Sequence, residues 1–216
     1  MTLKTTALAV AFGFAAAAAN AATVGLLDSS TNGVGNTADT FASGYFAATP
    51  DGATWSSDPT VSSGSVPNSF KSPFANTAIE GTTSYFAVGG ESGADGAPSP
   101  VTLTLASAVN GLSILWGSID SFNTISFYNS TNTLVDSFTG ADIIAMFGLP
   151  GKSSTFDQVA KLYFAADAGE DFKYISFSST QAAFEFALSE VPVPASGLLL
   201  VGGLAGVGAL RRRKKA

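Results

Sequence analysis

The 216-residue chain contains no cysteine and no histidine. It therefore has no disulfide and no catalytic thiol, and Ser-His-Asp or Cys-His catalysis in its usual form is excluded. Zinc, copper and haem sites that use histidine or cysteine ligands are excluded for the same reason. The side chains left for chemistry are carboxylates, hydroxyls, amides, aromatic rings and a few lysines.

Basic residues are scarce in the middle of the chain. Residues 22–190 hold all 16 acidic residues but only four of the ten basic ones (Lys71, Lys152, Lys161 and Lys173), so their formal net charge is −12. Phosphate and anionic lipid are both bound by clustered lysine and arginine. The composition therefore excludes a nucleic-acid partner, and it suits a well-hydrated protein outside the cell.

The first 21 residues have the layout of a secretory signal peptide. Lys4 precedes an apolar stretch from Ala7 to Ala19, and the small residues Ala19 and Ala21 flank Asn20. This pattern predicts export and cleavage by signal peptidase after Ala21. A buried alanine-rich helix is the alternative interpretation.

The last 26 residues combine a proline motif, an apolar run and a basic cluster. The apolar run, Ala195 to Leu210, has 16 residues. As a transmembrane helix it would span about 24 Å at ~1.5 Å per residue, less than the about 30 Å of a bilayer core. Basic residues stay on the cytoplasmic side, which would leave the body outside. The motif is Val191-Pro192-Val193-Pro194-Ala195, and the cluster is Arg211, Arg212, Arg213, Lys214 and Lys215.

A short apolar segment with a strong basic stop predicts a temporary membrane anchor. A retained C-terminal anchor, and a buried helix with a solvated basic end, are the two alternatives. The tail resembles the PEP-CTERM class of protein-sorting signals, and most closely the variant with a V-P-L-P-A motif, from which it differs by Val193. This resemblance covers residues 191–216.

The resemblance implies an exported protein of a Gram-negative bacterium. It implies that an exosortase, a membrane-embedded transpeptidase-like enzyme, cleaves the tail near the proline motif. The body would then reach the cell surface or the extracellular matrix, often in bacteria that make exopolysaccharide. The expected partners are signal peptidase, the exosortase-type enzyme, exopolysaccharide and, before processing, the membrane.

The expected domains are a signal peptide at 1–21, a body at 22–190 and a sorting signal at 191–216. The body is long enough for one hydrophobic core. Residues 28–83 are rich in turn formers, which predicts long loops and short strands. Low complexity or disorder is the alternative for residues 28–40.

Alternating apolar residues from Ser84 onward predict β-strands. Asp142 and Gly148 mark the start and end of one short predicted helix. Together they predict an all-β fold, an antiparallel β-sandwich of jelly-roll type with one helix. The residues that share strand faces are Val101, Leu103 and Leu105; Leu112, Ile114 and Trp116; Ile125 and Phe127; the run 134–138; Leu162 and Phe164; Ile175 and Phe177; and Phe184, Phe186 and Leu188.

The residues best suited to bind a ligand lie between Leu115 and Tyr128. Trp116, Asp120 and Asn123 are the types that sugar sites use, a ring for stacking and polar groups for hydroxyls. A structural interpretation competes with this one. Trp116 alternates in phase with other core residues, so its ring would be buried while Asp120 and Asn123 bond a turn.

Three segments of the body carry further resemblances. The block W-G-S-I-D-S-F-N-T-I-S-F-Y, which starts at Trp116, and the later Ser137-Phe138-Thr139-Gly140 resemble a family of small exosortase-dependent surface proteins. This resemblance implies no enzymatic activity. Residues 183–186 resemble the F-E-F-D-N strand that precedes many such tails, although Ala187 and Leu188 replace the D-N pair, so no role of that pair is carried over.

We expect no metal and no other cofactor. Glu91 and Asp95 lie in a glycine-rich loop and suggest calcium only weakly, because no D-x-D-x-D loop is present. The expected function is that of an exported, C-terminally processed, non-enzymatic surface or matrix protein associated with exopolysaccharide. A carbohydrate-binding module is the first alternative, and a carboxylate-dependent glycan hydrolase is the second.

Overall fold

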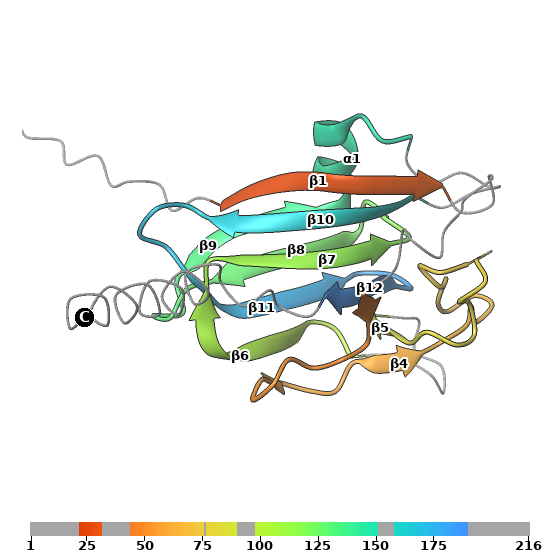
Figure 1. Ribbon diagram of the computed structural model, residues 1–216, viewed down its shortest axis with the longest axis horizontal. Helices are drawn as coiled ribbons and strands as arrows, with labels where there is room; N and C mark the ends of the chain where they lie inside the picture. The colour runs from red at the N-terminus through yellow and green to blue at the C-terminus, as the bar shows by residue number, and fades with distance from the viewer. Residues whose placement is uncertain (1–21, 32–43, 76, 90–97, 151–157, 190–216) are drawn as a thin grey trace, which may run out of the picture.

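Two antiparallel sheets pack face to face in this computed structural model, which describes residues 22–31, 44–75, 77–89, 98–150 and 158–189 (Figure 1). The predicted signal peptide, the sorting signal, Glu91, Asp95 and Lys152 lie outside the described residues. In the larger sheet, sheet A, the strand order is β1 (Ala22–Thr31), β10 (Gln158–Ala166), β7 (Gly111–Gly117), β12 (Phe184–Ser189), β5 (Tyr85–Val88) and β4 (Thr60–Ser62), while β2 (Tyr45–Phe46) also pairs with β12. In sheet B the order is β3 (Thr54–Trp55), β6 (Val101–Val109), β11 (Phe172–Ser179), β8 (Asn123–Tyr128) and β9 (Leu134–Thr139).

Strands β5 to β12 form a jelly roll. Their order is β5-β12-β7-β10 in sheet A and β6-β11-β8-β9 in sheet B. Successive strands therefore alternate between the sheets, except for the β8–β9 hairpin. This is the arrangement of an eight-stranded jelly roll built from two Greek keys. The predicted fold class is confirmed, and β1, β3 and β4 extend the two sheets at their edges.

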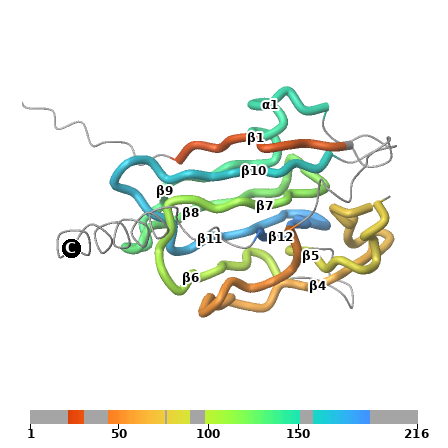
Figure 2. The backbone as a smooth tube through the Cα atoms, in the orientation of Figure 1, coloured from red at the N-terminus to blue at the C-terminus, as the bar shows by residue number. Residues whose placement is uncertain are grey.

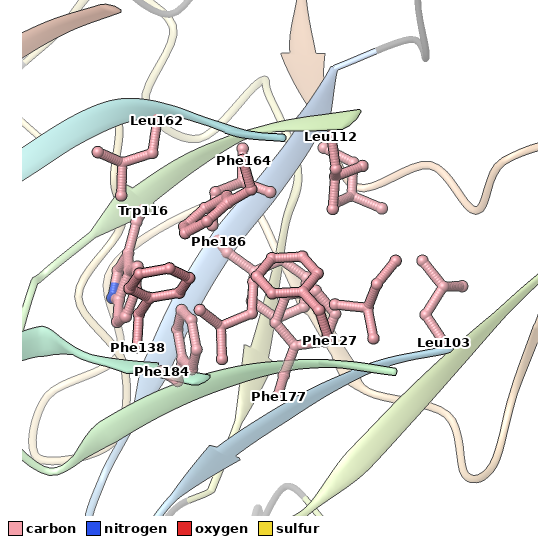
Figure 3. Packing of buried hydrophobic residues seen from close by; sticks show 14 of the residues in the cluster. Leu103, Leu112, Trp116, Phe127, Phe138, Leu162, Phe164, Phe177, Phe184 and Phe186 are labelled. Atoms are coloured by element: carbon pink, nitrogen blue, oxygen red, sulfur yellow. The ribbon is translucent and has the colours of Figure 1, made fainter. Parts of the chain in front are cut away.

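The alternating apolar residues form the core between the sheets. Val101, Leu103 and Leu105 of β6 are buried, as the alternation predicted. Aromatic rings fill the centre, and Phe177 of β11 stacks on Phe186 of β12 with ring centroids 4.0 Å apart, which joins the two sheets (Figure 3). Burial of such rings is the main term that stabilises a fold of this size.

The predicted short helix is present as α1 (Gly140–Phe147). The Thr139 side chain accepts a hydrogen bond from the backbone N–H of Asp142, and the Asp142 carboxylate bonds back to Thr139, which completes a capping box. Gly148 ends the helix with φ of 61°, a left-handed conformation that glycine adopts without strain. Ile143 anchors α1 in the core.

A second, smaller core covers the outer face of sheet A. Residues 44–84 run along the β4 and β5 end of the sandwich (Figure 2), and their side chains Phe70 and Phe74 pack against Tyr85, Leu115 and Val159. The central strands of sheet A are thus buried on both faces. Of the range 28–83, for which loops and short strands were predicted, residues 44–75 and 77–83 have this structure.

The N-terminal strand is the main difference from the sequence-based expectation. Residues Ala22–Thr31 form a ten-residue edge strand, although the sequence showed no strand pattern there. β1 pairs with β10 along its length, with a β-bulge between Leu26 and Asp28. The bulge breaks the alternation, which explains why the sequence pattern is weak. Asp28–Thr31 are thus strand, whereas residues 32–40 are not described.

Candidate functional site

Trp116 lies in the core between the sheets. Its ring is 0% exposed and stacks on Phe184, with centroids 4.4 Å apart and planes at 24° (Figure 3). A buried ring offers no face to a sugar, since stacking needs an accessible π surface. The geometry therefore favours the structural interpretation of this tryptophan over ligand contact.

Asp120 and Asn123 bond the turn that joins β7 to β8. The Ser118 hydroxyl donates to Asp120 Oδ2 at 3.1 Å, and Asn123 Nδ2 donates to the Ser118 carbonyl at 3.3 Å. The Ser179 hydroxyl donates to Asn123 Oδ1 at 2.8 Å, which ties the turn to the end of β11. Asn123 is fully buried, so its amide groups serve the fold rather than a ligand.

The two sequence blocks that carry the family resemblance lie against each other. β8 pairs with β9 so that Ile125 faces Phe138. Gly140, just after β9, lies so close to the Asp120 carbonyl that a Cβ there would overlap it. Only a residue without a side chain fits at position 140, because the backbone of Asp120 in the first block lies so close to it.

A polar cleft of about 380 Å³ lies beside this turn, on the outer side of sheet A. Phe184 and Phe186 point into the main core, so Glu185 between them points the other way, into the cleft. Asp120 reaches the same cleft from the β7–β8 turn. Lys71 lines it from the segment between β4 and β5, which we call the covering loop. Asp120 alone of the three predicted contact residues lines this cleft.

Both carboxylates of the cleft are held inside the protein. Glu185 is 2% exposed and Asp120 is 5% exposed. Glu185 Oε1 accepts a hydrogen bond from the Lys71 backbone N–H at 2.7 Å, which fixes the covering loop on β12. Asp120, the more exposed of the two, is the carboxylate of this cleft that can bond a hydroxyl group of a polar ligand.

Sequence reasoning did not select Glu185 and Lys71. The segment F-E-F predicts a glutamate that faces solvent, because the sequence does not show that a distant loop covers this face of the strand. The charge of Glu185 also acts on the buried Tyr85. Burial raises the pKa of Tyr85 to about 12; a hydrogen bond with Ser62 lowers it, and the charges of Glu185 and Glu80 raise it.

A second cavity of about 600 Å³ lies where β12 ends. Its lining includes Phe46 and Leu188, with Asp51 and Ser107 on the exposed rim and Ser189 as the last described residue of the strand. Next to it, Lys173 Nζ donates to the carbonyls of Leu105 and Ala106 at 2.6 and 2.9 Å. These bonds serve the middle of β6, where its register with β11 shifts, rather than a ligand.

Within the ranges given above, no three acidic side chains are grouped closely enough to hold a metal ion. In the same ranges, no helix has the length and apolar character needed to cross a bilayer.

The fold and the cleft define a jelly-roll domain with a polar cleft on one outer face. Comparisons with family models, with curated proteins and with solved structures find no match. The resemblances stated from the sequence therefore stay predictions.

Proposed function

We propose that this chain is an exported protein of the bacterial surface or matrix, freed from a temporary membrane anchor by cleavage near Val191–Ala195. In this proposal the jelly-roll body is the non-enzymatic working part of the protein and associates with exopolysaccharide. Signal peptidase and an exosortase-type enzyme are the processing partners. The body is acidic, which suits a hydrated matrix outside the cell.

The observation that supports this proposal is the agreement between the fold boundaries and the sequence signals. β1 begins at Ala22, directly after the predicted signal cleavage site, and β12 ends at Ser189, two residues before Val191. Both predicted cleavage sites thus fall outside the strands that the structure describes, so the cleavages would cut none of these strands.

The place of the last strand supports the same proposal. β12 lies inside sheet A, between β7 and β5, and is bonded on both sides. Ala195 lies six positions after Ser189, and a chain spans at most ~3.6 Å per position, about 22 Å in total. The precursor would therefore hold its body close to the membrane surface, within reach of a membrane-embedded enzyme.

Expression of a Pro192→Ala/Pro194→Ala double variant in the producing bacterium tests the proposal. We expect the variant to remain full length in the membrane fraction, while the wild-type protein is shortened and released. The matched control is Ser196→Ala, which changes the tail just beyond the motif and should be processed like wild type. Equal release of the double variant and wild type would contradict processing at the motif.

The cleft supports a second candidate function, the binding of a hydroxyl-rich ligand such as a sugar unit. The supporting observation is that Asp120 and Glu185 both line one cleft instead of lying on a solvated face. The released protein should bind the producer's own exopolysaccharide, and Asp120→Asn should weaken the binding. The exposed Asp58→Asn is the control. Equal binding by wild type and Asp120→Asn would refute ligand binding in this cleft. Release of reducing ends from the polysaccharide would indicate hydrolysis instead of binding.

A further inference from the structure

The first residue of β1 is bonded to the opposite sheet. The backbone nitrogen of Ala22 donates to Asp136 Oδ2 at 3.1 Å. Ala22 lies on the edge strand of sheet A, and Asp136 lies on β9, the edge strand of sheet B. The bond therefore joins the two sheets across the open side of the sandwich, between residues 114 positions apart in the chain.

Both partners are held in place by their surroundings. The Ser137 backbone N–H donates to Asp136 Oδ1 at 2.8 Å, which orients the carboxylate. Ala22 pairs with Ala166 of β10, and its side chain is 9% exposed and belongs to the main core. The nitrogen of Ala22 is thus positioned by pairing and packing, in addition to its bond with Asp136.

We propose that Asp136 is the binding site for the α-amino group that signal cleavage creates at Ala22. The inference rests on the proposed function, because it requires export and cleavage after Ala21. In that cleavage, water attacks the Ala21 carbonyl carbon, a C–O bond forms, the C–N bond breaks, and the Ala22 nitrogen leaves with a proton. At neutral pH the new amine takes up a second proton and becomes an ammonium group.

Cleavage changes the chemistry of this bond, whose two atoms are already in contact. Before cleavage, the Ala22 nitrogen is an amide with one N–H. After cleavage it is an ammonium group with a full positive charge, which faces a carboxylate that the protein already orients. The bond already has one charged partner before cleavage, the carboxylate, and cleavage adds the attraction between two opposite charges in contact. Processing therefore tightens the link between β1 and β9 and makes the mature body more stable than its precursor.

Thermal unfolding of two chains in mild detergent tests the inference. One chain begins at Ala22 and continues to Ala216, and the other keeps Asn20 and Ala21 in front of it. We expect a Tm higher by about 2–4 °C for the chain that begins at Ala22, the shift that about 1 kcal/mol produces in a domain of this size. In Asp136→Asn variants of the same two chains, the difference should disappear.

A matched control uses Asp28, whose Oδ1 accepts a hydrogen bond from the Ser29 backbone N–H at 2.8 Å, as Asp136 does from Ser137. Asp28→Asn variants of the two chains should keep the difference in Tm. Equal Tm values for the two wild-type chains, or a difference that persists in Asp136→Asn, would overturn the inference. So would a mature protein whose N-terminal sequence begins elsewhere than Ala22. Cell fractionation tests export separately, so failure of the proposed function is distinguishable from failure of this inference.

Discussion

The indole ring of Trp116 and the phenyl ring of Phe184 stack in the core, with centroids 4.4 Å apart. Trp116 lies on β7 and Phe184 on β12, two adjacent strands of sheet A, so the stack supports the centre of that sheet. The neighbouring Glu185 points to the opposite face. One strand thus contributes to the core and to the polar cleft with successive residues.

Fluorescence should report the burial of Trp116. The chain has two tryptophans, so a Trp55→Phe variant leaves Trp116 as the single indole. We expect blue-shifted emission and little quenching by acrylamide, because the ring is fully buried. Addition of exopolysaccharide should leave this emission unchanged. Quenching close to that of free tryptophan would show that the ring is accessible and would favour ligand contact.

Gly140→Ala should destabilise the protein even though it improves helix propensity. Alanine is favoured over glycine in helices by about 1 kcal/mol. At this position, however, the new Cβ would overlap the Asp120 carbonyl, and such overpacking costs about 1–3 kcal/mol. Denaturant unfolding should therefore show a net loss of stability.

The control for this prediction is Gly64→Ala. A Cβ at Gly64 meets no atom within 4 Å, and its φ is not left-handed. Its stability should be unchanged or slightly raised, because alanine restricts the unfolded chain. Equal effects of the two substitutions would contradict the contact between Gly140 and the β7–β8 turn.

Most of the jelly roll could be predicted from local pattern. Val101, Leu103 and Leu105 alternate because one side of β6 faces the core, and α1 follows from Asp142 and Gly148 at its ends. β1 could not be predicted in this way, because an edge strand with a bulge at Leu27 has no regular period. Its pairing with β10 decides its structure, and that pairing is long-range.

The candidate site was predictable only in part. Trp116, Asp120 and Asn123 were predicted as ligand contacts from their residue types. The alternation of Trp116 with Leu112 and Ile114 correctly indicated that it is buried. Glu185 was missed because alternation predicts only which side of a strand a residue takes. Whether that side meets water depends on the loop that carries Lys71, more than 100 residues earlier in the chain.

The capping box of α1 should give a pH-dependent contribution to stability. Hydrogen bonds from the Thr139 hydroxyl and backbone hold the pKa of Asp142 below its usual value, while partial burial raises it slightly. Since the folded pKa is lower than the unfolded one, the contribution is present above about pH 4. It is lost as the pH falls through the folded value.

Thr139→Ala should therefore cost about 1 kcal/mol at neutral pH, a typical value for an N-cap. The loss should shrink in acid, because the Thr139 hydrogen bonds favour the ionised form of Asp142 and this preference contributes nothing once Asp142 is protonated. Thr139→Ser keeps the hydroxyl and is the matched control, with stability close to wild type. Denaturant unfolding across the acid range measures both variants, and a loss independent of pH would contradict the role of Asp142.

Tyr85 should make stability fall in alkali. Its hydroxyl donates to the Gly64 carbonyl at 2.8 Å beneath the covering loop, and its pKa is raised to about 12 from 10.0. A raised folded pKa contributes stability that is fully present below the unfolded value. That contribution is lost as the pH rises from about 10 to about 12, so Tyr85→Phe should show a shallower decline over this range.

Two neighbours should move the pKa of Tyr85 in opposite directions. Glu185→Gln removes a nearby negative charge and should lower it, whereas Ser62→Ala removes a hydrogen bond that lowers it and should therefore raise it. Phenolate absorbance during alkaline titration measures the pKa, and circular dichroism identifies the pH at which the fold is lost. Shifts of the same sign in both variants would mean that general loosening of the loop, and not these two groups, controls the tyrosine. Opposite shifts would place the Glu185 carboxylate close to the Tyr85 ring beneath the loop that also forms the cleft.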